Sequence, residues 1–488
     1  MLIAAVALAE DSPNQDEKSA RPDQEEVVVT GTRTARLLSE VPVRTEVLSR
    51  DILDAAAARS LADAITFTPG VRVLNNCQNC NFTTLSMLGL EGKYSQVLFD
   101  SQPLFNSLSM VYGLEQIPAD MVERIEVVKG GGSAMYGPGA VGGVVNIIPR
   151  EFDVSGGRAY VNTEFMDTVR NWSAGFNTGL VSEDRSNHLS MFGMSARNHA
   201  YDRDADGFSD TARRNLTTFG GRMTHTMAGG GRLSLDYGRV DEDRRGGNNL
   251  TAPPFESDIA EWIRTERDMV AMNVDQPLGE TTDMKVNVSY ANTNRHAYYG
   301  VGGALDAYGT TINPLWVVDT QLNHRLGDHT LSWGLQYTDD KLDDDHPGHN
   351  RHLRSHAVNR GLFVQDDWTL QEHLTLLFGV RVDDHNMLAD PVISPRAALY
   401  YKPVESTTVR ASFSTGFLAP QVFDEDLHIA LAGGEPQIIV NGDNLKEEKS
   451  RSFTLGVEST PKVGHGWVLL EANVFHTELH DAFALTDE

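Results

Sequence analysis

The chain has 488 residues, a formal net charge of −27 and a pI near 4.9. This acidity argues against a nucleic-acid partner, and the length allows two or more domains. No stretch approaches the ~18 consecutive apolar residues of a transmembrane helix. A transmembrane β-barrel is not excluded, because its strands need apolar residues only at alternating positions.

The first nine residues are apolar. Leu2–Leu8 resembles the core of a signal peptide, and Ala7-Leu8-Ala9 resembles a small-x-small cleavage site, although no basic residue precedes them. Two interpretations stay open: residues 1–9 are the remnant of a signal peptide, which we favour, or they are an ordinary apolar start.

A short β-prone run, EEVVVTGTR at Glu25–Arg33, follows a polar leader that we expect to be flexible. An exposed extended segment can add a strand to a partner's sheet, which makes this run a handle that can be gripped. The alternative is that it forms the first strand of the next domain. The candidate partner-binding residues are Val27, Val28, Val29 and Thr30. We assign residues 10–40 to this flexible segment.

Residues 41–152 have the pattern of a small α+β domain. We expect helices over Asp51–Arg59 and Leu61–Ile65, and a short helix in which Ile117 and Met121 share a face. Two apolar β-prone runs, Ile125–Val128 and Val144–Ile148, flank a glycine cluster. So many glycines favour tight turns and close backbone approaches.

From residue 153 the pattern changes to alternating apolar and polar residues. Runs of roughly 8 to 12 residues are long enough to cross a bilayer as tilted strands. We count about fifteen such strands, and we expect the chain to be a fragment of a larger barrel, because bacterial barrels normally have an even number. Clear examples are Arg158–Phe165, Asn187–Ala196, Arg232–Val240, Lys285–Asn292, His329–Thr338, Gly361–Thr369, Leu374–Asp383 and Gly466–Phe475.

Two segments, IPADMVERIEVVKGGGSAMYG (Ile117–Gly137) and GAVGGVVNIIPR (Gly139–Arg150), resemble the plug domain of TonB-dependent outer-membrane receptors. LADAITFTPGVRV from Leu61 and TGFLAP at Thr415–Pro420 resemble other segments of that family. Leu88 and Leu418 stand where many relatives have arginine.

The resemblance implies an all-β transmembrane barrel of the type with about 22 strands, truncated here to about 15, with the α+β plug in its lumen. Val27–Thr30 would correspond to the TonB box, and the partners would be the TonB–ExbB–ExbD complex and outer-membrane lipid. The implied function is import of a metal chelate across a Gram-negative outer membrane, with a ferric siderophore favoured over haem, cobalamin or a copper or zinc complex. A passive pore or an adhesin is the alternative of a different class.

Cys77 and Cys80 are the two cysteines of the chain. A structural disulfide fits an oxidising periplasm, whereas a soft-metal contact or a redox role are the alternatives. The resemblance places this segment, and Tyr94 after it, among the plug residues that can meet ligand.

Asp202-x-Asp204-x-Asp206-Gly207 has the carboxylate spacing of a calcium loop, but the twelfth position is Arg213, which excludes an EF-hand. Two interpretations of this loop are kept: it binds a calcium ion that stabilises it, or it is a solvated acidic loop without a metal. We expect that the protein requires no cofactor.

Four histidines, His346, His349, His352 and His356, fall in a segment that we expect to be an extracellular loop. Imidazoles suit copper, zinc, nickel or haem iron, while a polar surface loop is the alternative. His428 lies where haem importers of the family often place an axial ligand. No nucleophile–base arrangement or phosphate-binding loop is present in the sequence, so we predict no enzyme.

Overall fold

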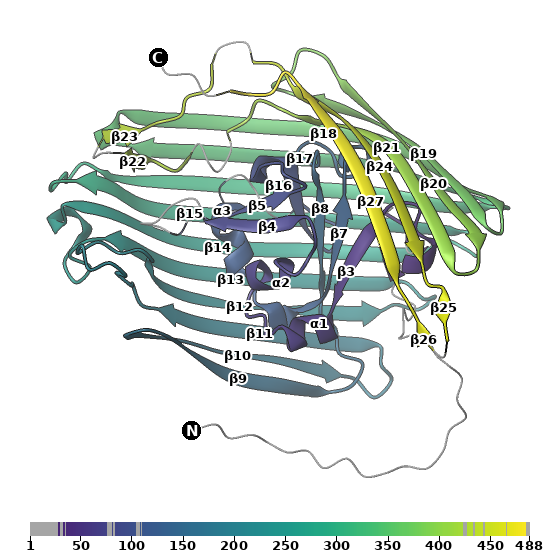
Figure 1. Cartoon of the computed structure of the whole chain (residues 1–488), viewed down its shortest axis with the longest axis horizontal. Coiled ribbons are helices and arrows are strands. Elements are labelled where there is room, and N and C mark those ends of the chain that lie inside the picture. The colour runs from purple at the N-terminus through teal and green to yellow at the C-terminus, as the bar shows by residue number, and fades with distance from the viewer. Residues whose placement is uncertain are drawn as a thin grey trace, which may run out of the picture.

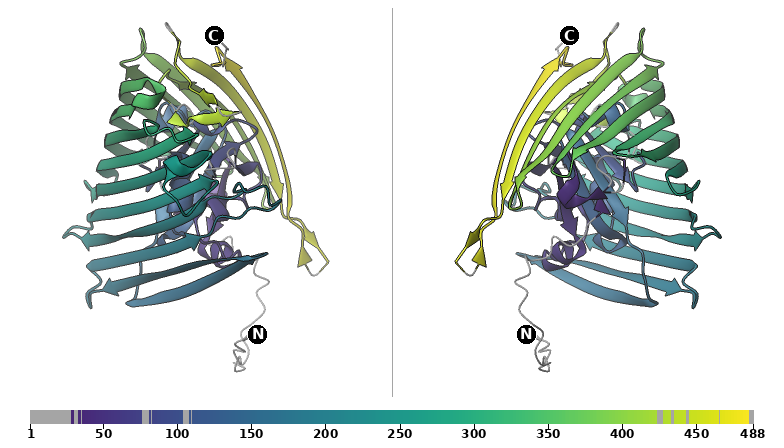
Figure 2. Two further views of the ribbon diagram at one scale, coloured as in Figure 1. Left: turned by 90° about the vertical axis from the view of Figure 1, so that its left-hand side faces the viewer. Right: turned by 90° about the vertical axis from the view of Figure 1, so that its right-hand side faces the viewer.

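The computed structural model describes residues 28–29, 33–34, 36–75, 81, 83–103, 108, 110–422, 427–432, 435–442, 445–464 and 466–484. A small α+β domain, here called the plug, lies on the concave side of a large curved sheet, here called the wall (Figures 1 and 2). The wall has fifteen strands, which confirms the number expected from the sequence. Within the described residues it is open, with β9 at one edge and β27 at the other.

Each wall strand pairs antiparallel with the next one along the chain, except that β21 pairs with β24 and β24 with β27. The strands are β9 (Gly156–Met166), β10 (Val169–Val181), β11 (Asn187–Asn198), β12 (Arg213–Thr226), β13 (Arg232–Gly247), β14 (Ile259–Pro277), β15 (Thr282–Val301), β16 (Tyr308–Leu326), β17 (His329–His346), β18 (Arg351–Gln371), β19 (Leu374–His385), β20 (Val392–Val404), β21 (Thr407–Leu418), β24 (Glu448–Ser459) and β27 (Leu470–His480).

Alternation along each strand gives the wall an apolar outer face and a polar inner face. On β17, for example, Trp333 and Leu335 are exposed, whereas Ser332 and Gln336 are buried. Exposed apolar bands of this kind cover the lipid-facing surface of outer-membrane barrels. The polar inner face therefore faces the plug.

The two ends of the wall differ in their connections. At one end, here called the turn end, the strands are joined by short turns at 182–186, 227–231, 278–281, 327–328, 372–373 and 405–406. At the other, here called the loop end, most connections are longer and run over 199–212, 248–258, 302–307, 347–350, 386–391 and 419–447. In outer-membrane barrels short turns face the periplasm and longer loops face outward.

The plug contains a mixed sheet in the order β3-β7-β8-β6, with β6 and β8 parallel. Ile125, Val127, Val145 and Ile147 from β7 and β8 are fully buried in its core, as their apolar runs predict. The plug elements are β3 (Thr45–Ser49), α1 (Arg50–Ala55), α2 (Leu61–Ile65), β4 (Val71–Asn75), β5 (Thr83–Met87), β6 (Ser95–Phe99), α3 (Met110–Gln116), β7 (Val122–Lys129), α4 (Ser133–Tyr136) and β8 (Gly143–Pro149).

Short two-stranded pairs complete the fold: β1 (Val28–Val29) with β2 (Arg36–Leu37), β22 (Ala430–Ala432) with β23 (Glu435–Gln437), and β25 (Lys462–Val463) with β26 (Gly466–Trp467). None of the helices in the described part of the chain is both long enough and apolar enough to span a membrane.

Two expectations about local structure were wrong. The short helix lies earlier than expected, because α3 ends at Gln116, just before the Ile117–Pro118 pair, and only a 3-10 turn follows at Ala119–Met121. Helical backbone is disfavoured for a residue that precedes proline, here Ile117 before Pro118, and α3 therefore ends before this pair.

The prediction that the four histidines lie in a loop was also wrong. Only Pro347–His349 forms a turn, whereas His352 and His356 lie on β18. Here the strands continue beyond the apolar band, so polar residues occupy both faces and no alternation reveals the strand.

We predict that Gly143→Ala destabilises the plug by about 1–3 kcal/mol. Gly143 has φ +151°, and an added Cβ atom would lie 2.2 Å from the Met87 sulfur and 2.4 Å from the Val128 carbonyl oxygen. The measurement is the rate at which protease cleaves the plug in the detergent-solubilised chain. Gly156→Ala is the control, since nothing lies within 4 Å of its added Cβ; equal cleavage rates for the two variants would contradict the prediction.

Candidate functional site

Two described residues of the expected handle, Val28 and Val29, lie near the turn end. Val28 and Val29 form β1, whose backbone pairs with Leu37 and Arg36 of β2. Arg36 places its Nη2 atom 3.1 Å from the Asp367 carboxylate, four residues from the turn end of β18. Val27 and Thr30 lie outside the described residues.

Arg33, the last residue of the handle run, is held in a buried socket of the wall. Its Nη1 atom donates to both carboxylate oxygens of Asp319, at 2.8 and 3.1 Å. The guanidinium carbon lies 4.7 Å from the ring centre of Phe363 and 5.2 Å from that of Tyr136 in α4. Because both side chains of the ion pair are nearly inaccessible, removing either partner leaves a buried charge, which is costly.

Helix α3 reaches the loop end of the lumen. Glu115 pairs with Arg214 at 2.5 Å and with Arg244, and Arg244 also pairs with Glu242 at 2.8 Å. Burial alone would raise the pKa of Glu115, but Arg244 and Arg214 outweigh burial and hold that pKa below its usual value. The guanidinium carbon of Arg244 lies 4.3 Å from the centre of the Tyr112 ring.

Three of the candidate histidines meet around Tyr299 of β15, close to Tyr112. The ring centres of His346 and His428 lie 5.8 and 5.7 Å from that of Tyr299, and His349 donates from Nε2 to the Tyr299 carbonyl oxygen at 2.8 Å. Burial lowers the pKa of His349, so its ring is neutral at pH 7. Tyr112, Tyr299 and Ile429 share one buried apolar cluster.

These histidines do not converge on a single metal position in the described structure. His428 is 3.4 Å from the Glu261 carboxylate, and His346 is 3.4 Å from that of Asp344. His352 faces outward beside Asp345, and Tyr94 is buried with Val141 and Leu418. Cys77 and Cys80 lie outside the described residues.

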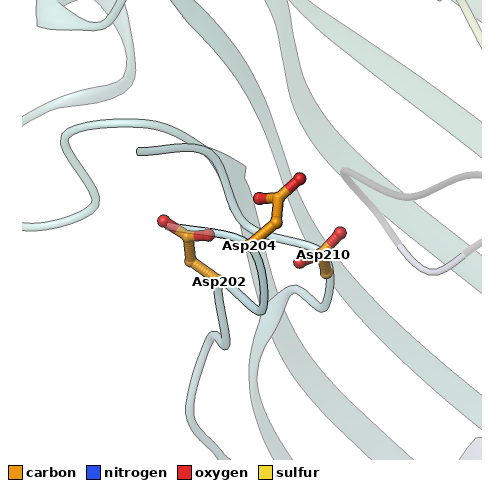
Figure 3. A group of neighbouring side chains, drawn as sticks. All are labelled: Asp202, Asp204 and Asp210. Atoms are coloured by element: carbon orange, nitrogen blue, oxygen red, sulfur yellow. The ribbon is translucent and has the colours of Figure 1, made fainter. Parts of the chain in front are cut away.

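The acidic loop brings together Asp202, Asp204 and Asp210 (Figure 3). Asp206 is not part of this group. Asp202 accepts from the backbone N–H groups of Ala205 and Gly207, at 2.7 and 2.9 Å. The loop thus already uses its carboxylates to satisfy its own backbone. A bound calcium stays a prediction.

A cavity of about 260 Å³ separates α2 from the wall near the loop end. Arg59 and Asp63 line it on the plug side, and Trp172, Asn198 and Arg214 line it on the wall side. Its walls carry both charges, so it is polar enough to hold water.

Sequence reasoning missed Arg33, Tyr112 and Tyr299 as individual site residues. Arg33 was visible as the end of the Glu25–Arg33 run, but its partner Asp319 is 286 residues away. No local pattern distinguishes Tyr299 from the other strand tyrosines, so its role depends on the folded arrangement.

Family comparisons agree with this architecture. The model for the TonB-dependent receptor plug domain matches residues 38–144, and the model for the TonB-dependent receptor-like β-barrel matches residues 152–488. The chain belongs to the TonB-dependent receptors. Receptors of this family reside in the Gram-negative outer membrane, and this receptor is accordingly an outer-membrane protein.

The relatives are distant. The receptor is 26% identical to the iron-regulated outer membrane virulence protein of Vibrio cholerae, in an alignment 508 positions long that covers 99% of this chain and 71% of that protein. It is 25% identical to the ferric enterobactin receptor PirA of Pseudomonas aeruginosa, covering 96% and 72%. The crystal structure of a variant of the ferric enterobactin receptor PfeA from Pseudomonas aeruginosa superimposes with a TM-score of 0.75 at 19% identity, covering 93% and 73%.

We predict that docking of α3 depends on pH through Glu115. Because its folded pKa is depressed, its ion pairs contribute fully above the ordinary carboxyl pKa of about 4.3 and are lost as pH falls through the lower folded value. Glu115→Gln should weaken docking by about 1–3 kcal/mol at pH 7 and remove this pH dependence. The measurement is hydrogen exchange of 110–116 between pH 7 and 3.

Glu123→Gln is the matched control, since Glu123 is a half-exposed plug carboxylate 4.0 Å from Arg150. It should leave the exchange profile of α3 unchanged. A Glu115→Gln profile that coincides with wild type would rule out this role of Glu115.

Proposed function

We propose that this receptor imports a ferric siderophore across the outer membrane, with energy supplied through its N-terminal handle by a TonB–ExbB–ExbD complex. The observation that carries the proposal is the placement of the two plug regions at opposite ends of the lumen. The handle and Arg33 lie toward the turn end, while α3 and the Tyr299 cluster lie at the loop end. Ligand and energy partner can therefore act on one plug from opposite sides of the membrane.

The names of the relatives support iron chelates as the substrate class, since one is iron-regulated and another receives ferric enterobactin. At the loop end, Tyr112 and Tyr299 are buried with arginines nearby, and the guanidinium groups of Arg244 and Arg295 lie over the Tyr112 ring. Guanidinium groups and aromatic faces suit flat, electron-rich, anionic ligands. A catecholate siderophore has this chemistry.

The β1 pairing supports the handle assignment. Within the described residues, two residue pairs join β1 to β2, and these are the pairs to be lost before the segment joins a partner's sheet. Strand addition relies on main-chain hydrogen bonds, and β1 already has the extended backbone that this mode requires.

We predict that Val28→Pro abolishes uptake while leaving ligand binding intact, because proline removes a backbone donor that strand addition uses. Uptake of radioactive ferric enterobactin and its binding to de-energised cells are measured side by side. Val28→Thr, which keeps the β-branched shape, is the matched control and should transport normally. Wild-type uptake by Val28→Pro would exclude the handle assignment.

We also predict that the receptor restores growth on ferric enterobactin to an iron-starved Gram-negative host that lacks its own siderophore receptors. Haemin in the same medium and cyanocobalamin in a cobalamin-dependent assay are tested in parallel. Growth on either of these but not on ferric enterobactin would contradict the siderophore assignment and select the corresponding alternative.

A further inference from the structure

The long connection between β21 and β24, residues 419–447, turns back into the lumen at the loop end. It leaves the wall at Leu418 and returns at Glu448, and these two residues are paired across neighbouring strands. Its β22 strand lies beside β15, and the β22–β23 pair lies within the curve of the wall (Figure 2, left). Because the connection starts and ends at adjacent points, it can move while β21 and β24 stay paired.

The part of this connection that reaches deepest is residues 427–429, here called the strap. Leu427 is 2% exposed and belongs to one buried cluster with Leu108 of the plug and Leu342 of β17. Ile429, two residues further on, is fully buried in a second cluster. The strap therefore fills space between the plug and the wall with two apolar side chains.

Ile429 covers the aromatic residues that the proposed function assigns to the ligand. It shares its cluster with Tyr112 of α3 and Tyr299 of β15, which are 2% and 1% exposed. The other members, Ile263 and Ala297, belong to the wall strands β14 and β15. Among the described residues of this cluster, Ile429 is thus the one that a loop contributes, and the chelate reaches the tyrosines only after Ile429 has moved.

Two polar contacts of the strap with the wall are both long. Arg351 donates from Nη2 to the Leu427 carbonyl oxygen at 3.3 Å, and the His428 Nε2 atom lies 3.4 Å from the Glu261 carboxylate. Hydrogen bonds of this length are weak. Arg351 also has a much shorter contact, 2.6 Å, with Asp344, so its charge keeps a partner when the strap leaves. Burial of two apolar side chains is therefore the main force that holds the strap in place.

We propose that the strap is an occluding segment, in which Ile429 fills the aromatic site and has to be displaced by the arriving chelate. This inference rests on the proposed siderophore import and adds the regulation of its binding site. Only the conformation with the strap displaced binds ligand, so the apparent affinity is lowered by the fraction of that conformation. A solute without affinity for the two tyrosine rings cannot offset the exposure of Leu427 and Ile429, and the strap thereby contributes to selectivity.

The test measures association of ferric enterobactin with de-energised cells that carry Ile429→Ala or Leu427→Ala in the intact receptor. Each truncation should raise the association rate and the apparent affinity by about tenfold, because loss of a buried apolar side chain increases the fraction with the strap displaced. Val440→Ala is the matched control and should bind as wild type, since Val440 lies in the same connection and is 79% exposed. Faster association is a gain that misfolding does not produce.

Association at or below the wild-type rate in both strap variants would overturn the proposal. Weaker binding would make Leu427 and Ile429 contacts of the ligand and not an obstruction to it. An unchanged rate would mean that the strap does not limit access to the aromatic site.

A second measurement needs no ligand and separates this inference from the proposed function. In a receptor with both cysteines replaced, Cys77→Ser and Cys80→Ser, Ala297→Cys places one thiol in the cluster beneath Ile429. A water-soluble maleimide should label this thiol slowly, and about tenfold faster once Ile429→Ala is added. Equal labelling rates would refute the strap whatever the ligand is. Faster labelling without any binding of ferric enterobactin would support the strap and refute the siderophore assignment.

Discussion

The polar inner face of the wall is the constraint on which the rest of this receptor depends. Lipid requires apolar residues on the outer face, and strand alternation then places polar residues inside. Buried polar and charged groups need partners, and here the plug supplies many of them. Asp319 meets Arg33, Glu242 meets Gln116, and Arg222 meets Asp100.

An interface of this composition can be both tight and reversible. Each buried ion pair opposes the loss of one partner, which keeps the plug seated at rest. Water can nevertheless solvate the same groups once a path opens, and solvation lowers the cost of separating them. A continuous apolar interface would lack this route, because its exposure to water is unfavourable at every stage.

Sequence patterns were sufficient for the general architecture. The alternation of apolar and polar residues identified the wall strands, because one face of each strand contacts lipid. The apolar runs Ile125–Val128 and Val144–Ile148 identified β7 and β8. The patterns failed where lipid no longer constrains the residues. His352 and His356 continue β18 beyond the apolar band, and polar residues on both faces there are indistinguishable from a loop.

The candidate site was only partly predictable for a related reason. Local motifs indicated Val28, Val29 and the histidines, but pairing across the lumen decides what they contact. His346 and His428 are far apart in sequence, yet both rings lie against Tyr299. Arg33 and Asp319, or Arg222 and Asp100, belong to separate domains, and a single sequence contains no signal that joins them.

Net charge is a poor guide to the ligand for the same reason. The chain carries −27, and this total mildly favours a cationic complex. At the loop end, however, Arg214 and Arg244 face Glu115 and Glu242, and Arg351 faces Asp344. Because these largely buried cations and carboxylates are paired one against another, the charge at this end of the lumen is locally balanced. The local pairing therefore bears on the proposed siderophore assignment more directly than the total charge does.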